Sequence, residues 1–245
     1  MRTMSLWESK ESNGKVSLAS LFEGDADVAA ISDLTIEGLA YATCRGGWPA
    51  STKLKEKAAL RVARNYVEEV INYDVHRVDG VDKNTTRVRK LLESYARNIS
   101  TMAANETIMA DVRATDQTIS PNTFAIYLSA LRRIFIVDDV PAWSPALRSK
   151  TKIRTSPKRH FVDPSIAVAL MGTNPQGLLK DFPTFGFLFE DLCARDLRVY
   201  AQALDGEVYH YRDKNELECD LVVALRDGRW GAVEVKLGKN EEEDA

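Results

Sequence analysis

LECDLVVALRDGRWGAVEVKL, residues 217–237, holds two short apolar runs separated by Arg226-Asp227-Gly228. Short apolar runs on either side of a glycine-containing turn are typical of a β-hairpin. EVYHYRD at 207–213 adds a third strand, and the apolar pattern of residues 183–204 predicts a long helix before it. The end of the chain is therefore predicted to fold as a helix followed by three strands.

Four charged side chains fall in or beside these strands, namely Glu190, Asp220, Glu234 and Lys236. Glu234 and Lys236 are two positions apart, so they project from the same face of a strand. A charge inside an apolar strand is costly unless it is paired or functional. We expect Asp220 and Glu234 to hold Mg²⁺, and all four residues to form a catalytic site for phosphodiester cleavage. The alternative is a surface hairpin that carries the same charges in solvent.

The length of the hairpin turn decides whether this site can form. A two-residue turn at 227–228 would direct Asp220 and Glu234 to opposite faces of the sheet. A three-residue turn at 226–228, with its glycine in the left-handed conformation, places Asp220 opposite Glu234. We predict the three-residue turn, with Lys236 adjacent and Glu190 approaching from the preceding helix.

The middle of the chain, residues 81–174, shows a different order of elements. Three amphipathic helices, two short strands and a further helix are expected, at 86–101, 105–112, 120–133, 135–140, 159–162 and 163–172. Three helices followed by a pair of strands is the order of a winged helix-turn-helix.

Basic residues gather in the predicted wing and at the end of the third helix. The wing residues follow one another without an intervening acid, and alternating members share one face of an extended segment. Cations in these places are what phosphate contact requires. We expect DNA to be bound by Arg132, Arg133, Arg148, Lys150, Lys152, Arg154, Lys158 and Arg159. The alternatives are a solvated charged hairpin and a winged helix that binds protein.

Residues 1–80 are expected to form a polar connector and a pair of helices. The connector covers 1–32, and a helical pattern then runs from Asp33 to Tyr73. It is interrupted at GGWP, residues 46–49, which is a stop signal for a helix.

The composition excludes several classes of protein. The net charge of −3 gives no global sign of nucleic-acid binding, so any basic surface must be local. The three cysteines lie far apart without CxxC spacing, which indicates a reducing compartment and neither disulfides nor a zinc site. No apolar segment follows Arg2 as in a signal peptide, and no window approaches the roughly 18 apolar residues of a membrane span. We expect a cytoplasmic protein without membrane contact.

Five strings of the sequence together resemble one group of proteins. They are MRTMSLWESKESNG (1–14), CRGGWP (44–49), ARNIST (96–101), PAWSPALRSKTKIRTSPKRHFVDPSIA (141–167) and YHYRDKNELECDLVVALRDGRWGAVEVKLG (209–238). They are similar to bacterial AAA-superfamily ATP-binding proteins, whose C-terminal part is catalogued as domain of unknown function 4143. The resemblance covers nearly the whole chain.

The resemblance implies a multi-module α+β protein with three parts. These are a connector and helical lid-like segment of an AAA ATPase at 1–80, a winged-helix domain at 81–174, and a PD-(D/E)xK restriction-endonuclease-like α/β domain at 175–245. Members of the group carry an upstream P-loop, GxxxxGK[ST], and an acidic Walker-B strand, and neither is found in this sequence. We therefore expect no ATP site and no ATPase activity from the chain alone.

Two further departures bear on the last domain. The group's nuclease-like domain continues beyond VKLG, so we expect this one to be truncated. Cys219-Asp220 stands where the nuclease motif has Pro-Asp, which weakens the case for cleavage.

The expected function is that of the DNA-binding, nuclease-like C-terminal portion of an AAA-type ATPase, with a Mg²⁺-dependent phosphodiester site. The ATPase core would then be supplied by another chain. One alternative is a non-catalytic regulatory or protein-interaction module of an ATPase. Another is a truncated remnant without independent activity. The sequence leaves open whether the chain is an enzyme.

Overall fold

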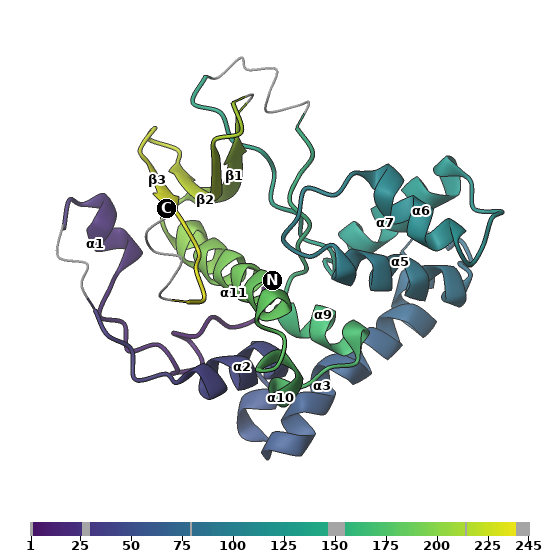
Figure 1. Ribbon diagram of the computed structural model, residues 1–245, viewed down its shortest axis with the longest axis horizontal. Coiled ribbons are helices and arrows are strands. Elements are labelled where there is room, and N and C mark those ends of the chain that lie inside the picture. Colours follow the sequence, from purple (N-terminus) through teal and green to yellow (C-terminus); the bar gives the residue numbers. More distant parts are fainter. Residues whose placement is uncertain (1, 26–29, 79, 147–154, 214, 239–245) are drawn as a thin grey trace.

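The computed structural model describes residues 2–25, 30–78, 80–146, 155–213 and 215–238. The fold is mixed α+β, with a mainly helical part and a small antiparallel sheet whose strand order is β1-β2-β3. Figure 1 shows the long helix α11 running from the helical part to the sheet. Within the described residues, no helix combines the length and apolar character needed to cross a membrane.

The bounds of the elements follow the chain in order. The helices are α1 (Leu18–Phe22), α2 (Ile36–Arg45), the 3-10 turn η1 (Ser51–Lys53), α3 (Glu56–Glu69), the π-helical turn η2 (Val70–Asp74), α4 (Val75–Arg77), α5 (Thr85–Arg97), α6 (Asn105–Arg113), α7 (Pro121–Arg133), α9 (Pro164–Met171), α10 (Pro175–Leu178) and α11 (Phe182–Ala203). The strands are β1 (Gly206–Arg212), β2 (Glu218–Leu225) and β3 (Trp230–Val233).

One apolar core fills the helical part. It includes side chains from α2, α3, α5, α6, α7 and α9, and the largest of them, such as Tyr95, Leu91 and Leu128, are almost fully buried. The core therefore encloses helices from both sides of residue 80, where the sequence predicts a boundary between modules. In the described part of the chain these helices are packed as one body.

Two of the predicted helices, α7 and α9, begin at a side-chain cap. The Ser120 hydroxyl accepts from the Thr123 amide at the start of α7, with Pro121 as the first helical residue. Asp163 caps α9 in the same way, and α9 ends at Gly172, whose φ of 66° is left-handed. Asn105, where the sequence predicts the second helix to begin, is the first residue of α6 and does not cap it, because its side chain accepts a hydrogen bond from Arg159.

The strands predicted at 135–140 and 159–162 form only isolated bridges, Val137 with Phe161 and Val140 with Lys158. The segment after Val140 then pairs with the sheet. Ala142 forms a parallel bridge with His210 of β1, and the Trp143 amide donates to the His210 carbonyl at 2.7 Å. The strand pair of the helical part therefore joins the edge of the C-terminal sheet.

The hairpin of β2 and β3 has the predicted register. Leu221 lies opposite Val233, and the Leu225 amide donates to the Arg229 carbonyl at 2.8 Å. Three residues, 226–228, form the turn, and Gly228 has a φ of 94°. Continuing this register by one residue beyond the ladder places Asp220 opposite Glu234, so the predicted three-residue turn is confirmed.

A bulge between β1 and β2 was not expected from the sequence. Tyr209 pairs with Val222, whereas Tyr211 pairs with Cys219, so Asp220 and Leu221 together stand opposite His210. A bulge of this kind changes the direction of a side chain locally. Here it falls on the acidic residue of the predicted site.

A buried polar cluster joins the N-terminal segment to the helices, and we name it the Asp163 junction (Gly47, Asp163, Ser165, Arg195, Asp196). Asp163 is fully buried, and its carboxylate accepts from the Gly47 amide at 2.8 Å and from Arg195 at 3.1 Å. The other carboxylate oxygen accepts from the Ser165 amide and hydroxyl. All of these donors satisfy a charge that would otherwise be costly to bury.

The N-terminal segment attaches to this junction through its backbone. The Met4 amide donates to the Gly47 carbonyl at 2.7 Å, and the Leu6 amide donates to Asp196 at 2.9 Å. A side chain at Gly47 would collide with the backbone of Met4. Glycine at position 47 is therefore required by close approach of two backbones.

Gly47→Ala should destabilise the protein, because the added methyl group forces the Met4 segment away from the junction. We expect a loss of about 2 to 3 kcal/mol in the free energy of unfolding, measured by urea denaturation. Gly186→Ala is the matched control, since position 186 lies within α11 and nothing stands within 4 Å of an added Cβ. That variant should gain up to about 1 kcal/mol. Equal stability changes for both variants would contradict the packing argument.

Candidate functional site

The predicted carboxylates converge on a residue that the sequence assigned to another role. Lys158 Nζ donates to Glu190 Oε1 and to Asp220 Oδ1, at 2.9 Å in each case. Lys158 is only 6% exposed, so both ion pairs are shielded from solvent. We name Lys158, Glu190, Asp220 and Glu234 the carboxylate–lysine cluster.

Three elements position this cluster. Lys158 is held by two backbone hydrogen bonds with Val140, at 2.9 and 3.0 Å. Glu190 lies on α11, which packs against the sheet. Asp220 sits in the β2 bulge, and its second oxygen accepts from the Val235 amide at 3.0 Å. The cluster therefore joins the strand pair, the long helix and the hairpin.

Glu234 and Lys236 complete the predicted set from the end of the hairpin. The side chain of Glu234 lies beside that of Asp220, and Lys236 Nζ lies 3.1 Å from Glu234 Oε1. The structure thus brings all four predicted residues together in one connected group. Their order in that group is Glu190, Lys158, Asp220, Glu234 and Lys236, with Lys158 as the unexpected member.

The electrostatics of the cluster follow from burial and from the lysine. Burial acts to lower the pKa of Lys158, but the carboxylates of Glu190 and Asp220 outweigh it, and the pKa is raised. Burial acts to raise the pKa of Asp220, but the Lys158 ammonium outweighs it, and the pKa is lowered. Burial raises the pKa of Glu190 to about 7, although Lys158 opposes that shift. Lys158 and Asp220 are therefore a charged pair at neutral pH, while Glu190 exchanges its proton there.

The cluster does not fit the magnesium ion that the sequence led us to expect. Mg²⁺ needs carboxylate oxygens that are free to approach within roughly 2.1 Å, together with room for several waters. Lys158 already supplies a cation between Glu190 and Asp220, at hydrogen-bonding distance from both. Among the residues that the structure describes, no group of three or more His, Cys, Asp or Glu side chains is placed to hold a metal ion.

Lys158 and Arg159 are corrections to the predicted DNA-binding set, because both are buried in ion pairs. Arg159 is 2% exposed and donates to Asp139, to the Tyr95 hydroxyl and to the Ala103 carbonyl. A cation held in this way is not available to a phosphate group. The basic pattern at this end of the wing reflects internal pairing.

His160 continues the same pattern. Its Nδ1 lies 2.7 Å from Asp191 Oδ1, and both side chains are fully buried. Burial lowers the pKa of His160 to about 3 and raises the pKa of Asp191 well above its usual range. Burial therefore favours the uncharged forms of both groups. Lys158, Arg159 and His160 each meet an acidic partner, so the end of the strand pair is held by side chains of α11 and the neighbouring loop.

The other predicted DNA contacts differ in availability. Arg132 donates to Asp139 at 2.7 Å and remains partly exposed, and Arg133 is exposed. Arg148, Lys150, Lys152 and Arg154 lie outside the described residues. Contact of DNA with these six residues stays a prediction.

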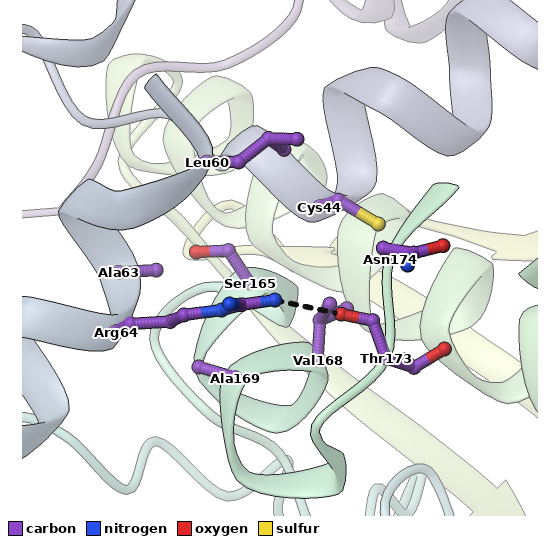
Figure 2. A pocket seen from close by; sticks show the side chains of 9 residues that line it. All are labelled: Cys44, Leu60, Ala63, Arg64, Ser165, Val168, Ala169, Thr173 and Asn174. Atoms are coloured by element: carbon purple, nitrogen blue, oxygen red, sulfur yellow. Dashed lines mark hydrogen bonds between the residues drawn. The ribbon is translucent and has the colours of Figure 1, made fainter. Parts of the chain in front are cut away.

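A small cavity beside α3 and α9 offers no second site. Figure 2 shows Cys44, Arg64 and Ser165 among its lining residues, with Arg64 donating to the Thr173 carbonyl. Its volume of about 10 Å³ holds no more than one water molecule. Burial raises the pKa of the Cys44 thiol to about 12, so this thiol is not a reactive nucleophile.

Sequence reasoning missed Lys158 as a member of the site, although one signal was present. The segment 158–162 places Lys, Arg and His directly before Phe161 and Val162 in an expected strand, where burial is common. The helix 183–204 likewise carries Glu190, Asp191 and Asp196 among apolar residues. A basic segment and an acidic segment that both lie among apolar residues are predicted to pair with each other. Which basic residue meets which acid depends on the fold.

Two family models match the chain. One is described as a domain of unknown function (DUF8612) and matches residues 36–177, which is more than half of the chain. The other is described as a domain of unknown function (DUF4143) and matches residues 185–245. Neither a curated protein nor a solved structure matches.

Lys158→Met should destabilise the protein by about 3 to 5 kcal/mol, because the buried carboxylates lose their cation. Adding Glu190→Gln and Asp220→Asn to this variant should restore most of the loss, since the unpaired charges are then removed. Urea denaturation measures both effects, and Lys180→Met, at an exposed position, is the control. If the triple variant is no more stable than Lys158→Met, the ion pairs do not hold the cluster.

Glu190→Gln should remove a pH dependence of stability. A carboxyl whose pKa rises on folding, here from 4.5 to about 7, stabilises the fold while it is protonated. That contribution is fully present below the unfolded pKa of 4.5 and is lost as pH rises through about 7. Between pH 5 and pH 8 the wild type should therefore lose roughly 2 kcal/mol relative to Glu190→Gln. Parallel stability curves for the two proteins would contradict the raised pKa.

Proposed function

We propose a non-catalytic role for this chain, which belongs to the family described as a domain of unknown function (DUF8612). In this proposal the chain is a regulatory and interaction module that works with an AAA-type ATPase core. The nuclease-like carboxylates of its end domain serve as internal ion-pair partners. They fix the C-terminal sheet to the helical part.

The observation that carries the proposal is the place of Lys158. Its ammonium group lies 2.9 Å from Glu190 and 2.9 Å from Asp220, between two of the residues that a metal-dependent nuclease would need. A buried lysine with two carboxylate partners is costly to withdraw, because it leaves uncompensated charge behind. The carboxylates are therefore engaged in structure, which supports an interaction role over cleavage.

The link to an ATPase rests on the second family match. The DUF4143 domain, which matches residues 185–245, is often found with AAA ATPases. The resemblance of GGWP and its flanking helices to an AAA lid supports the same association. The winged-helix order of α5 to α7 and the following strand pair supports a module that docks on a partner.

The rival function is metal-dependent cleavage of DNA, and one observation favours it. The β2–β3 register places Asp220 opposite Glu234 with Lys236 beside it, as a PD-(D/E)xK nuclease requires. This function needs Lys158 to leave the carboxylates. It also needs DNA contact through the exposed basic residues of the predicted wing.

Plasmid nicking in Mg²⁺ or Mn²⁺ separates the two functions. We expect wild type and Asp220→Ala to give the same background, because Lys158 leaves no metal site to lose. Glu106→Ala, which changes an exposed carboxylate on α6, is the matched control for the loss of an acid. Metal-dependent nicking that Asp220→Ala abolishes and Glu106→Ala retains would overturn the non-catalytic role in favour of the nuclease.

A further inference from the structure

We propose that Lys53, Lys55, Lys57 and Arg61, at the start of α3, form a surface that contacts the phosphate backbone of a nucleic acid. We name these residues the α3 basic stripe. All four are exposed, and Glu56 is the only acid between residues 46 and 67. This is a local basic surface on a chain whose net charge is −3.

The stripe differs from several arginines of the helical part, which are held in ion pairs. Arg87 pairs with Asp116, Arg89 with Glu68, and Arg97 with Asp111. Within the described residues, none of the four stripe residues lies in an ion pair. Their charge is therefore available to a partner, unlike that of Lys158 and Arg159.

The position of the stripe is unfavourable for the helix by itself. The N-terminus of a helix carries a partial positive charge, so acidic side chains are preferred there and lysines are not. Lys55 stands at the N-cap of α3 and makes no side-chain capping bond, and Lys57 follows in a first turn whose one acidic residue is Glu56. Lysines at the start of a helix are disfavoured by its dipole, and no ion pair within the described residues compensates for them. Such residues point to a contact with another molecule. A negatively charged ligand is the compensation that fits.

The chemistry of the surface favours a nucleic acid over an acidic protein. Specific protein interfaces have an apolar core inside a polar rim. Leu54 is the only large exposed apolar side chain described among residues 32–72, so the stripe lacks such a core. Lys57 and Arg61 are one turn apart, about 6 Å along the helix axis, and present a row of cations. Phosphate contacts need a row of cations and no apolar core.

The test is the salt dependence of binding to fluorescently labelled DNA, measured by anisotropy on duplex and single-stranded oligonucleotides. Each phosphate-contacting cation contributes about one unit to the slope of log K against log salt concentration. The variant Lys53→Gln/Lys55→Gln/Lys57→Gln/Arg61→Gln should therefore reduce the slope by about 3 to 4 and weaken binding at low salt on the order of tenfold or more. Thermal unfolding confirms that the variant remains folded.

Two matched variants and one competitor complete the experiment. The control Lys10→Gln/Lys15→Gln/Arg77→Gln/Lys180→Gln removes the same charge from other exposed positions and should leave the slope unchanged to within about one unit. The rival Arg148→Gln/Lys150→Gln/Lys152→Gln/Arg154→Gln removes the predicted wing contacts. The proposal is overturned if DNA is not bound, if the stripe variant binds like wild type, or if the wing variant alone removes the slope. It is also overturned if polyglutamate competes as well as DNA at equal charge.

Discussion

The buried carboxylate of Asp163 is the constraint on which the arrangement of the helical part depends. Because a buried charge must be fully hydrogen-bonded, Asp163 requires the Gly47 amide, the Ser165 amide and hydroxyl, and the Arg195 guanidinium at the same time. Those donors come from the segment after α2, the start of α9 and the middle of α11. The single acid therefore fixes three helices against one another, and the Met4 segment closes over Gly47.

The position of α11 then determines the chemistry around the sheet. With Arg195 fixed, Glu190 and Asp191, about one turn earlier, face the strand that carries Lys158 and His160. Arg198, about one turn later, donates to the carbonyls of Asp138 and Asp139 in the opposite strand. The helix thus meets the strand pair through ionic and polar groups in addition to apolar side chains, since Val140 belongs to the same buried cluster as Ala194 and Ala201 of α11. Buried ion pairs add little net stability, but breaking one is costly, so these pairs favour one docking of the sheet.

Local chemistry made part of this structure predictable. Ser120-Pro121 and Asp163-Pro164 begin helices by side-chain capping, and the three-residue turn 226–228, with Gly228 in the left-handed conformation, set the hairpin register. The register in turn placed Asp220 against Glu234, so that part of the site was predictable from a count of residues. The burial of Lys158 was not, because it depends on contacts with residues 32 and 62 positions away along the chain, and the β2 bulge was not expected either. An alternating basic segment has the same pattern whether its partner is a phosphate or a carboxylate.

A motif of carboxylates determines where negative charge gathers, but it does not determine which cation neutralises that charge. In this fold, Glu190 and Asp220 both pair with Lys158, and Glu234 lies beside Asp220. The first cation they meet is Lys158, which lies on the strand paired with the one that carries the Ala142 bridge to β1. The same strand pair extends the sheet and neutralises the carboxylates. When the strand pair docks on the sheet, it therefore also compensates the charge of Glu190 and Asp220. A separate ion would compete with a cation that the chain itself holds in place at high local concentration.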